Sequence, residues 1–257
     1  MKYYSYFILV LVFPLCTSLS QVKGTLWDQE QISNVTVLLY QQTSDTSPVS
    51  GSGTILSYDS AFYLLTASHV AKSMQVTAKI VFRLPVDKPF FADLAALTAS
   101  KTFKWKVHPI ADIAILELSP TTSELRKQLD EWSFPIKQIY SGKDLPNRDA
   151  GLTFLGYPVV DMEMEHFSPL VFTCDRASGL ITQTRSDTKT KCNFFFLSMP
   201  SIQGCSGSGV YFSVNKSMYL GGDTTVLIGL IHGTMTDNTG GKLAAVTPSY
   251  YIFDLLK

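Results

Sequence analysis

The chain has 257 residues, of which 46% are hydrophobic, 12% aromatic and 16% charged, with 16 glycines and 12 prolines. This composition is typical of a compact domain with a buried core and excludes a low-complexity chain. Lysine and arginine together number 21, as do aspartate and glutamate, so no net field favours nucleic acid, an anionic membrane or an acidic substrate.

The first 20 residues have the order of a secretory signal. Lys2 precedes an apolar run over residues 6–15, and the small residue Ser20 marks a cleavage site before Gln21. The apolar run is too short to span a bilayer. We therefore expect a signal peptide at 1–20, a secreted or periplasmic protein, and no membrane span in the mature chain; the alternative is a short N-terminal anchor.

Three of the four cysteines belong to the predicted mature chain. Export would place Cys174, Cys192 and Cys205 in an oxidising compartment, where an odd number leaves one thiol unpaired. Cys174 and Cys192 flank predicted strands and are the expected disulfide. Cys205 would then lie free in a glycine-rich loop.

From Val35 onward the chain has the pattern of short β-strands. Residues 76–84 and 102–107 alternate apolar and polar side chains, which indicates strands with one buried and one exposed face. Five further apolar runs are separated by glycine, asparagine, aspartate and serine clusters that indicate turns, at 152–156, 170–174, 194–199, 210–214 and 226–231. The sequence predicts an antiparallel sandwich or barrel arrangement.

One clear helical segment, residues 120–132, separates the two groups of strands. Thr121 and Glu124 have the spacing of a capping box, and apolar side chains from Leu125 to Trp132 share one face. A second short helix is predicted at 249–256. We therefore expect an N-terminal β-barrel at 21–120, a connector with a helix at 121–148, and a C-terminal β-barrel with a C-terminal helix at 149–257.

Three segments far apart in the sequence each contain one reactive residue. FYLLTASHV presents His69 at a strand end, HPIADIAILEL places Asp112 as a lone acid before apolar residues, and GCSGSG contains Ser206. Each alone has an ordinary explanation as a structural histidine, a turn former or a loop. Together they supply what acyl transfer needs, because a serine hydroxyl is a poor nucleophile until a histidine takes its proton and an acid orients that histidine.

The segments TASHV, ADIAIL and GCSGSG resemble the histidine, aspartate and nucleophile boxes of the chymotrypsin-like (trypsin-fold) serine peptidases, in the same order. The resemblance covers most of residues 35–255 and is nearer the bacterial glutamyl-endopeptidase and HtrA-like branches. It implies an all-β fold of two six-stranded antiparallel β-barrels. It also implies an oxyanion hole made by the N–H groups of Gly204 and Ser206.

The nucleophile box distinguishes Ser206 from its neighbour Cys205. The box needs glycine two residues before the nucleophile and directly after it, and only Ser206 has both, as Gly204 and Gly207. Digestive members of the family have an aspartate at the place of Cys205. Its absence predicts an enzyme that needs no zymogen cleavage of the trypsin type.

By the same resemblance, the primary specificity pocket includes Ser201, Gln203, His232, Gly233 and Thr234. His232 and Ser201 could hydrogen-bond a glutamate carboxylate. Alternatively, His232 is a structural residue beside the catalytic aspartate, and the pocket takes a small or apolar side chain. Both interpretations stay open from the sequence.

The resemblance implies a secreted serine endopeptidase that hydrolyses peptide bonds through a Ser-His-Asp triad and an acyl-enzyme intermediate. We expect protein or peptide substrates, no nucleic acid, no cofactor and no metal site. The alternative is a catalytically weak or inactive peptidase-fold protein that binds partners in the same cleft. Oligomeric state and glycosylation at Asn34 and Asn215 stay open.

Overall fold

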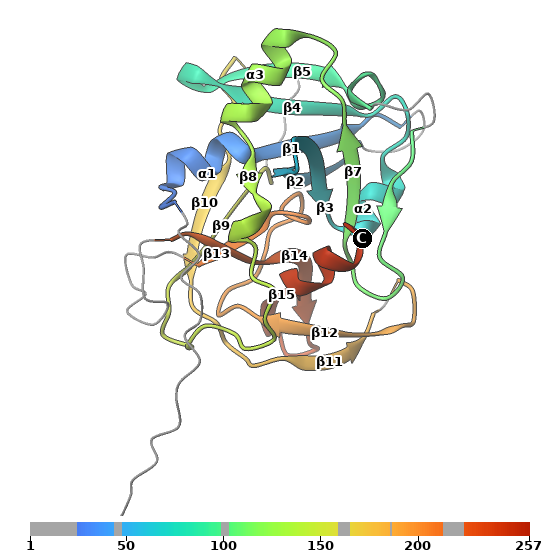
Figure 1. Cartoon of the computed structure of the whole chain (residues 1–257). Helices are drawn as coiled ribbons and strands as arrows, with labels where there is room; N and C mark the ends of the chain where they lie inside the picture. The colour runs from blue at the N-terminus through green and yellow to red at the C-terminus, as the bar shows by residue number, and fades with distance from the viewer. Residues whose placement is uncertain (1–24, 44–47, 99–102, 159–164, 186, 213–223) are drawn as a thin grey trace, which may run out of the picture.

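A computed structural model describes residues 25–43, 48–98, 103–158, 165–185, 187–212 and 224–257 (Figure 1). The predicted signal peptide at 1–20 and the acceptor Asn215 lie outside these residues. Most of the described chain belongs to two antiparallel sheets that follow one another along the sequence.

The first sheet contains eight strands in the order β5-β4-β1-β2-β3-β7-β6, with β8 pairing in parallel with β2. Its apolar side chains pack on one another in a core that includes Ile55, Leu64 and Ile80. The β2–β3 hairpin turns at Asp59 and Ser60, whose φ angles of 46° and 66° suit a two-residue turn of twisted strands. The strands are β1 (Thr36–Gln41), β2 (Val49–Tyr58), β3 (Ala61–Thr66), β4 (Lys79–Leu84), β5 (Lys88–Asp93), β6 (Lys106–Val107), β7 (Ala114–Leu118) and β8 (Phe134–Pro135).

The second sheet contains seven strands in the order β10-β9-β13-β14-β15-β12-β11. Phe154, Phe195, Val210 and Val246 belong to its own core. The strands are β9 (Leu152–Gly156), β10 (Leu170–Cys174), β11 (Ile181–Thr184), β12 (Lys191–Phe196), β13 (Gly209–Phe212), β14 (Val226–Thr236) and β15 (Lys242–Pro248).

The predicted all-β architecture is confirmed, with eight and seven strands in place of six and six. In the first sheet the difference is due to β6 and β8, which have two residues each. The strand β8 falls within the range expected for the connector, so part of that segment completes the first sheet.

Helical segments are short and lie between or beside the strands. They are α1 (Gln29–Val35), α2 (Ser68–Ser73), α3 (Ser123–Glu131), and the 3₁₀ turns at Pro85–Asp87, Leu94–Leu97, Ile136–Gln138 and Ser249–Asp254. The connector helix is present, but its cap lies one residue later than predicted, because Thr122 Oγ1 accepts the Leu125 N–H at 3.1 Å. The C-terminal segment is a 3₁₀ helix. In the described part of the chain, no helix combines the length and apolarity needed to cross a membrane.

A third apolar cluster joins the two sheets. Leu65 and Ile115 enter it from the first sheet, and Phe194 and Leu230 from the second. Ile252 of the C-terminal 3₁₀ helix packs in the same cluster, and Figure 1 shows this red segment where the two halves meet. Burial of this shared apolar surface holds the halves together.

The expected disulfide between Cys174 and Cys192 is not present. Both thiols are free and buried, as is that of Cys205. Cys174 packs inside the second sheet's own core, whereas Cys192 packs in the cluster between the sheets. An antiparallel bridge pairs Arg176 with Leu197, so Cys192 and Cys174 lie in opposite directions from it, separated by more than about 15 Å of extended strand. This exceeds the reach of a disulfide.

A buried glutamine, Gln138, links the N-terminal segment to the second half of the molecule. The Gln138 Nε2 donates to the carbonyl oxygens of Thr25 at 2.6 Å and Thr225 at 2.8 Å, and its Oε1 accepts the Trp27 indole N–H at 3.3 Å. Thr225 Oγ1 also accepts the Trp27 backbone N–H at 2.8 Å. The side chain of Gln138 thus satisfies three polar groups from two distant segments.

We expect Gln138→Ala to lower the free energy of unfolding by about 2–3 kcal/mol, because the carbonyl of the buried Thr225 loses this donor and the Trp27 indole N–H loses its acceptor. Denaturant titration of the purified chain measures this. The matched control is Gln75→Ala, since Gln75 is exposed, and it should change the free energy of unfolding by less than about 0.5 kcal/mol. Equal effects of the two changes would contradict the role assigned to Gln138.

Candidate active site

His69 lies at the junction between β3 and α2. The strand ends at Thr66, Ala67 is the N-terminal cap, and His69 is the second residue of the helix. Thr66 Oγ1 donates to the Ser52 carbonyl oxygen at 2.7 Å, which fixes the strand end against β2. The junction turns the His69 side chain toward the second half of the molecule, where it contacts His232.

Asp112 lies in the short loop between β6 and β7 and is fully buried. The loop is shaped by His108, whose Nδ1 accepts the backbone N–H groups of Ala111 at 2.9 Å and Ile110 at 3.2 Å. Sequence analysis did not identify this role of His108. In the loop held by His108, the Asp112 carboxylate lies at the boundary between the two halves.

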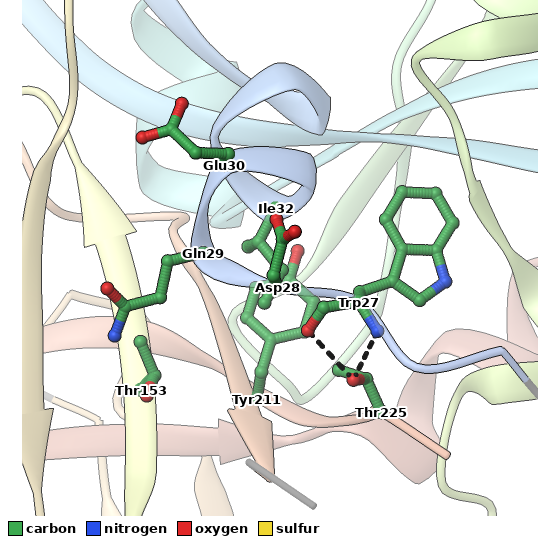
Figure 2. A pocket seen from close by; sticks show the side chains of 8 residues that line it. All are labelled: Trp27, Asp28, Gln29, Glu30, Ile32, Thr153, Tyr211 and Thr225. Carbon is green, nitrogen blue, oxygen red and sulfur yellow. Dashed lines mark hydrogen bonds between the residues drawn. The ribbon is translucent and has the colours of Figure 1, made fainter. Parts of the chain in front are cut away.

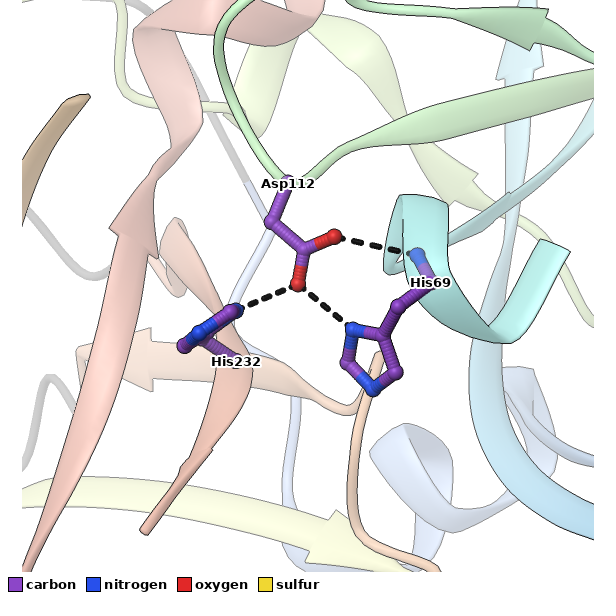
Figure 3. Close-up of side chains that lie close together, drawn as sticks. All are labelled: His69, Asp112 and His232. Carbon is purple, nitrogen blue, oxygen red and sulfur yellow. Dashed lines mark hydrogen bonds and ion pairs between the residues drawn. The ribbon is translucent and has the colours of Figure 1, made fainter. Parts of the chain in front are cut away.

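The Asp112 carboxylate is the centre of the site. Its Oδ2 lies 2.7 Å from His69 Nδ1 and 2.5 Å from His232 Nδ1 (Figure 3). Its Oδ1 accepts the His69 backbone N–H at 3.0 Å, the Ser68 hydroxyl at 2.5 Å and an Arg185 N–H at 3.0 Å. An ionised carboxylate only accepts hydrogen bonds, so both Nδ1 atoms carry protons and the neutral His69 has its lone pair on Nε2.

The charge state of Asp112 follows from two opposed effects. Burial favours the neutral acid, but hydrogen bonds from His232 and His69 outweigh it and lower the pKa of the carboxyl well below its usual range. Asp112 is therefore a carboxylate at every pH at which the protein is expected to work. It can orient the His69 ring and stabilise its protonated form.

Ser206 lies in the turn between β12 and β13, and two glycines shape that turn. Gly204 and Gly207 have φ angles of 96° and 87°, in the left-handed region that favours glycine. A Cβ on Gly207 would lie 2.2 Å from the Ser52 carbonyl oxygen. The turn therefore packs directly on β2 of the other half, and the Ser52 N–H donates to the Ser206 carbonyl oxygen at 2.8 Å.

The backbone around Ser206 offers free donors. Cys205 N–H donates to Ile202 at 3.0 Å and Gly207 N–H to Ile231 at 2.8 Å. Within the described residues, the N–H groups of Gly204 and Ser206 have no such acceptor. Two fixed, unpaired N–H groups beside a hydroxyl can stabilise a negative oxygen without reorganisation.

The Ser206 hydroxyl points to His232, not to His69. Its Oγ donates to the His232 carbonyl oxygen at 3.2 Å. His232 therefore contacts Ser206 through its backbone and Asp112 through its ring, and the three predicted triad residues meet around it. Hydrogen bonds between catalytic groups are often long or poorly aligned without substrate and tighten in the complex.

His232 occupies an irregular position in β14. The register of β14 with β15 shifts between Ile231 and Gly233, which turns the His232 side chain toward Asp112. The ring is tilted over Phe194 at a centroid distance of 5.0 Å and meets the His69 ring edge-on at 5.7 Å. Of the two interpretations drawn from the sequence, this contact supports a structural residue beside the aspartate.

The other predicted pocket residues lie near this strand. Ser201 N–H donates to Thr234 Oγ1 at 3.0 Å, and the two hydroxyl oxygens are 2.9 Å apart. Gly233 has open space where a side chain would stand, and Gln203 is exposed. The structure thus pairs Ser201 with Thr234 and leaves Gln203 on the surface.

His69, Asp112 and His232 form the one group in the described ranges with the spacing of metal ligands. The donor set does not fit a metal ion. Both Nδ1 atoms carry protons directed at Asp112, and the Arg185 guanidinium already lies 3.0 Å from that carboxylate. A second cation would be repelled there.

A pocket of about 450 Å³ lies away from these residues, between α1 and the second sheet (Figure 2). Its acidic side chains already have partners. Asp28 accepts the Gln31 N–H at the start of α1, and Glu30 pairs with Arg83 at 2.8 Å. None of the predicted site residues lines this pocket.

No family model and no curated protein matches the sequence. Solved structures match over 88% of the chain: the Rv3671c protease from M. tuberculosis (TM-score 0.55, 15% identity, 81% of that chain), the HtrA-type protease AlgW (0.52, 15%, 60%) and a mutant of the Tobacco Etch Virus protease (0.52, 13%, 80%). The chain therefore has the two-barrel fold of chymotrypsin-like serine proteases.

The cysteine thiols are protonated as well as buried. Burial raises the pKa of Cys205 to about 11 and that of Cys174 to about 12, and it also raises the pKa of Cys192. Because the thiolate is the reactive form, none of the three is an activated nucleophile. This includes Cys205, the direct neighbour of Ser206.

We expect iodoacetamide at pH 8 to leave Cys174, Cys192 and Cys205 unmodified in the folded protein. In guanidinium without reductant all three should react, because none is in a disulfide. Peptide mass spectrometry measures both results. Labelling of Cys205 alone after unfolding would show that the other two are bonded, and rapid labelling of folded Cys205 would identify a reactive thiol.

Proposed function

We propose that this chain is a secreted or periplasmic serine endopeptidase with Ser206 as nucleophile, His69 as general base and Asp112 as the orienting acid. The observation that carries the proposal is the buried Asp112 carboxylate at His69 Nδ1, beside a turn that presents Ser206 and two unpaired N–H groups. The fold supports it, since the proteins with this fold named above are described as proteases. Export rests on the N-terminal sequence.

In the proposed reaction, each of these groups has a separate role. The Ser206 hydroxyl rotates from the His232 carbonyl to His69 Nε2, which takes its proton as Oγ attacks the peptide carbonyl. The N–H groups of Gly204 and Ser206 hold the oxyanion, and Asp112 stabilises the imidazolium. His69 then protonates the leaving amine, and water hydrolyses the acyl-enzyme in the same way.

The hydrogen bonds around the proposed specificity pocket favour an uncharged side chain. Thr234 Oγ1 also donates to the Ser201 carbonyl oxygen at 2.7 Å, so the hydroxyls of Ser201 and Thr234 are paired with each other's residue. The Nδ1 proton of His232 is directed to Asp112. A glutamate carboxylate would need free donors to offset its desolvation. The donors of Ser201, Thr234 and His232 are already used in these hydrogen bonds.

We expect Ser206→Ala to abolish both peptide hydrolysis and labelling by a fluorophosphonate, because the probe reacts with an activated serine. Circular dichroism should show an unchanged fold. The matched control is Ser57→Ala on β2, which should keep labelling and turnover at the level of the unmodified protein. Labelling that survives Ser206→Ala would place the nucleophile elsewhere, and a wild-type chain that neither labels nor cleaves would favour the binding-protein alternative.

We also expect peptides with alanine at the cleaved position to have a kcat/KM at least about tenfold above that of matched peptides with glutamate there. Thr234→Gly should improve cleavage after larger apolar residues, because it removes the link to Ser201. A peptide library with product sequencing measures both. Preferred cleavage after glutamate would contradict this pocket assignment while leaving the nucleophile assignment intact.

A further inference from the structure

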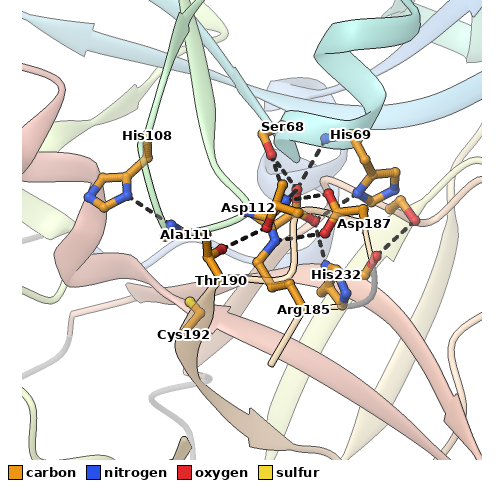
Figure 4. A network of polar contacts seen from close by, with 12 residues as sticks. Ser68, His69, His108, Ala111, Asp112, Arg185, Asp187, Thr190, Cys192 and His232 are labelled. Carbon is orange, nitrogen blue, oxygen red and sulfur yellow. Dashed lines mark hydrogen bonds and ion pairs between the residues drawn. The ribbon is translucent and has the colours of Figure 1, made fainter. Parts of the chain in front are cut away.

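A buried arginine reaches the site from the second half of the molecule. Arg185 directly follows β11, and its side chain is 1% exposed. Its Nη2 donates to Asp112 Oδ1 and to the Ser68 hydroxyl, each at 3.0 Å (Figure 4). Its Nη1 donates to the Ile110 carbonyl oxygen at 3.1 Å. All three acceptors belong to the first half.

Arg185 has a second carboxylate partner on its own loop. Asp187 accepts from Nε at 3.0 Å and from Nη2 at 2.6 Å, the two-point contact that suits a guanidinium. The loop is closed by backbone bonds between Arg185 and Thr190 at 2.9 Å and between Lys189 and Arg185 at 3.0 Å. The arginine is thus held at its base and at both ends of its planar group.

The sum of charges explains why two carboxylates are needed. Arg185 alone would neutralise Asp112 and remove the negative charge that favours a protonated His69. With Asp187 ionised, the three groups carry a net charge of one negative unit, which matches one imidazolium. The ionised form of Asp187 is favoured because, although burial acts against it, its hydrogen bond to Arg185 lowers its pKa.

We propose that Arg185 and Asp187 are positioning residues of the proposed peptidase: the ion pair fixes the Asp112 carboxylate from the opposite barrel and sets the charge that His69 experiences. This inference rests on the proposed function. Arg185 contacts Oδ1 only, so it leaves Oδ2 for the two imidazoles.

Few other titratable groups face the pair. His232 faces Asp112 from β14, and His108 and Cys192 lie near enough to Arg185 to interact electrostatically. Burial lowers the pKa of His108 and raises that of Cys192, so both are neutral near pH 7. The charges of Arg185 and Asp187 are therefore the ones to remove in a test, because the neighbouring His108 and Cys192 carry no charge near pH 7.

The test removes each charge in turn and follows the pH dependence of fluorophosphonate labelling of Ser206. The acid limb reports protonation of His69, which must be neutral to act as base. Arg185→Met removes a cation and should move the midpoint up by about one pH unit, whereas Asp187→Asn removes an anion and should move it down. The double variant should return the midpoint to within about half a unit of wild type.

Geometry is separated from charge by a conservative variant. Arg185→Lys keeps the cation but lacks the planar fork, so it should keep the wild-type midpoint while the plateau rate falls about tenfold or more. The control is Arg126→Met, an exposed arginine on α3, which should change neither quantity. Thermal unfolding of each variant verifies folding. If Arg185→Met does not fold, the Asp187→Asn and double variants still show the direction in which the labelling midpoint shifts.

Shifts of the two single variants in the same direction, or no shift in either, would overturn the role of the pair. If the wild-type chain is not labelled at all, the proposed function fails. The pair is then tested alone by the His69 titration midpoint in proton NMR spectra, where the same opposite shifts are expected.

Discussion

The site depends on one buried negative charge, the carboxylate of Asp112. A carboxylate out of water is costly unless donors surround it, and here five donors do so. Ser68 and His69 come from the first half, whereas Arg185 and His232 come from the second. Each half supplies only part of these donors, so the polar contacts at the site and the apolar cluster between the sheets stabilise the same docked arrangement.

The nucleophile turn is under the same constraint from the other side. Ser206 belongs to the second half by sequence, but Ser52 of β2 holds its backbone: the Ser52 N–H donates to the Ser206 carbonyl oxygen and the Ser52 hydroxyl donates to that of Gly204 at 2.8 Å. The hydroxyl of Ser52 also accepts the Tyr157 N–H at 3.0 Å. The conformation that leaves two N–H groups unpaired is therefore a product of docking as well as of the glycines.

Sequence patterns could predict the parts of this arrangement that are local. Alternation of side chains predicts strands because each strand has one face in a core, and a short motif identifies Ser206 because its turn needs glycine at fixed positions. The helix α1 was not predicted, although Asp28 and Gln31 have the spacing of the capping box seen in the structure. The predicted cap of α3 lies one residue before the observed cap, because Thr121 and Thr122 are equally good caps by type.

The rest could not be predicted because it depends on contacts between distant segments. The stretch TRSDTKT has the composition of an exposed turn, and Arg185 is buried only because Asp112, Ser68 and Ile110 lie opposite it. The positions of Cys174 and Cys192 beside predicted strands favour a disulfide, but the distance between the two thiols depends on how those strands pair, which the sequence does not show.

His232 shows the same limit. Its ring donates to Asp112 while its carbonyl holds the Ser206 hydroxyl, and this double contact arises from a register shift in β14. In the proposed mechanism the hydroxyl leaves that carbonyl for His69, so the residue that helps to hold the acid also sets the resting position of the nucleophile.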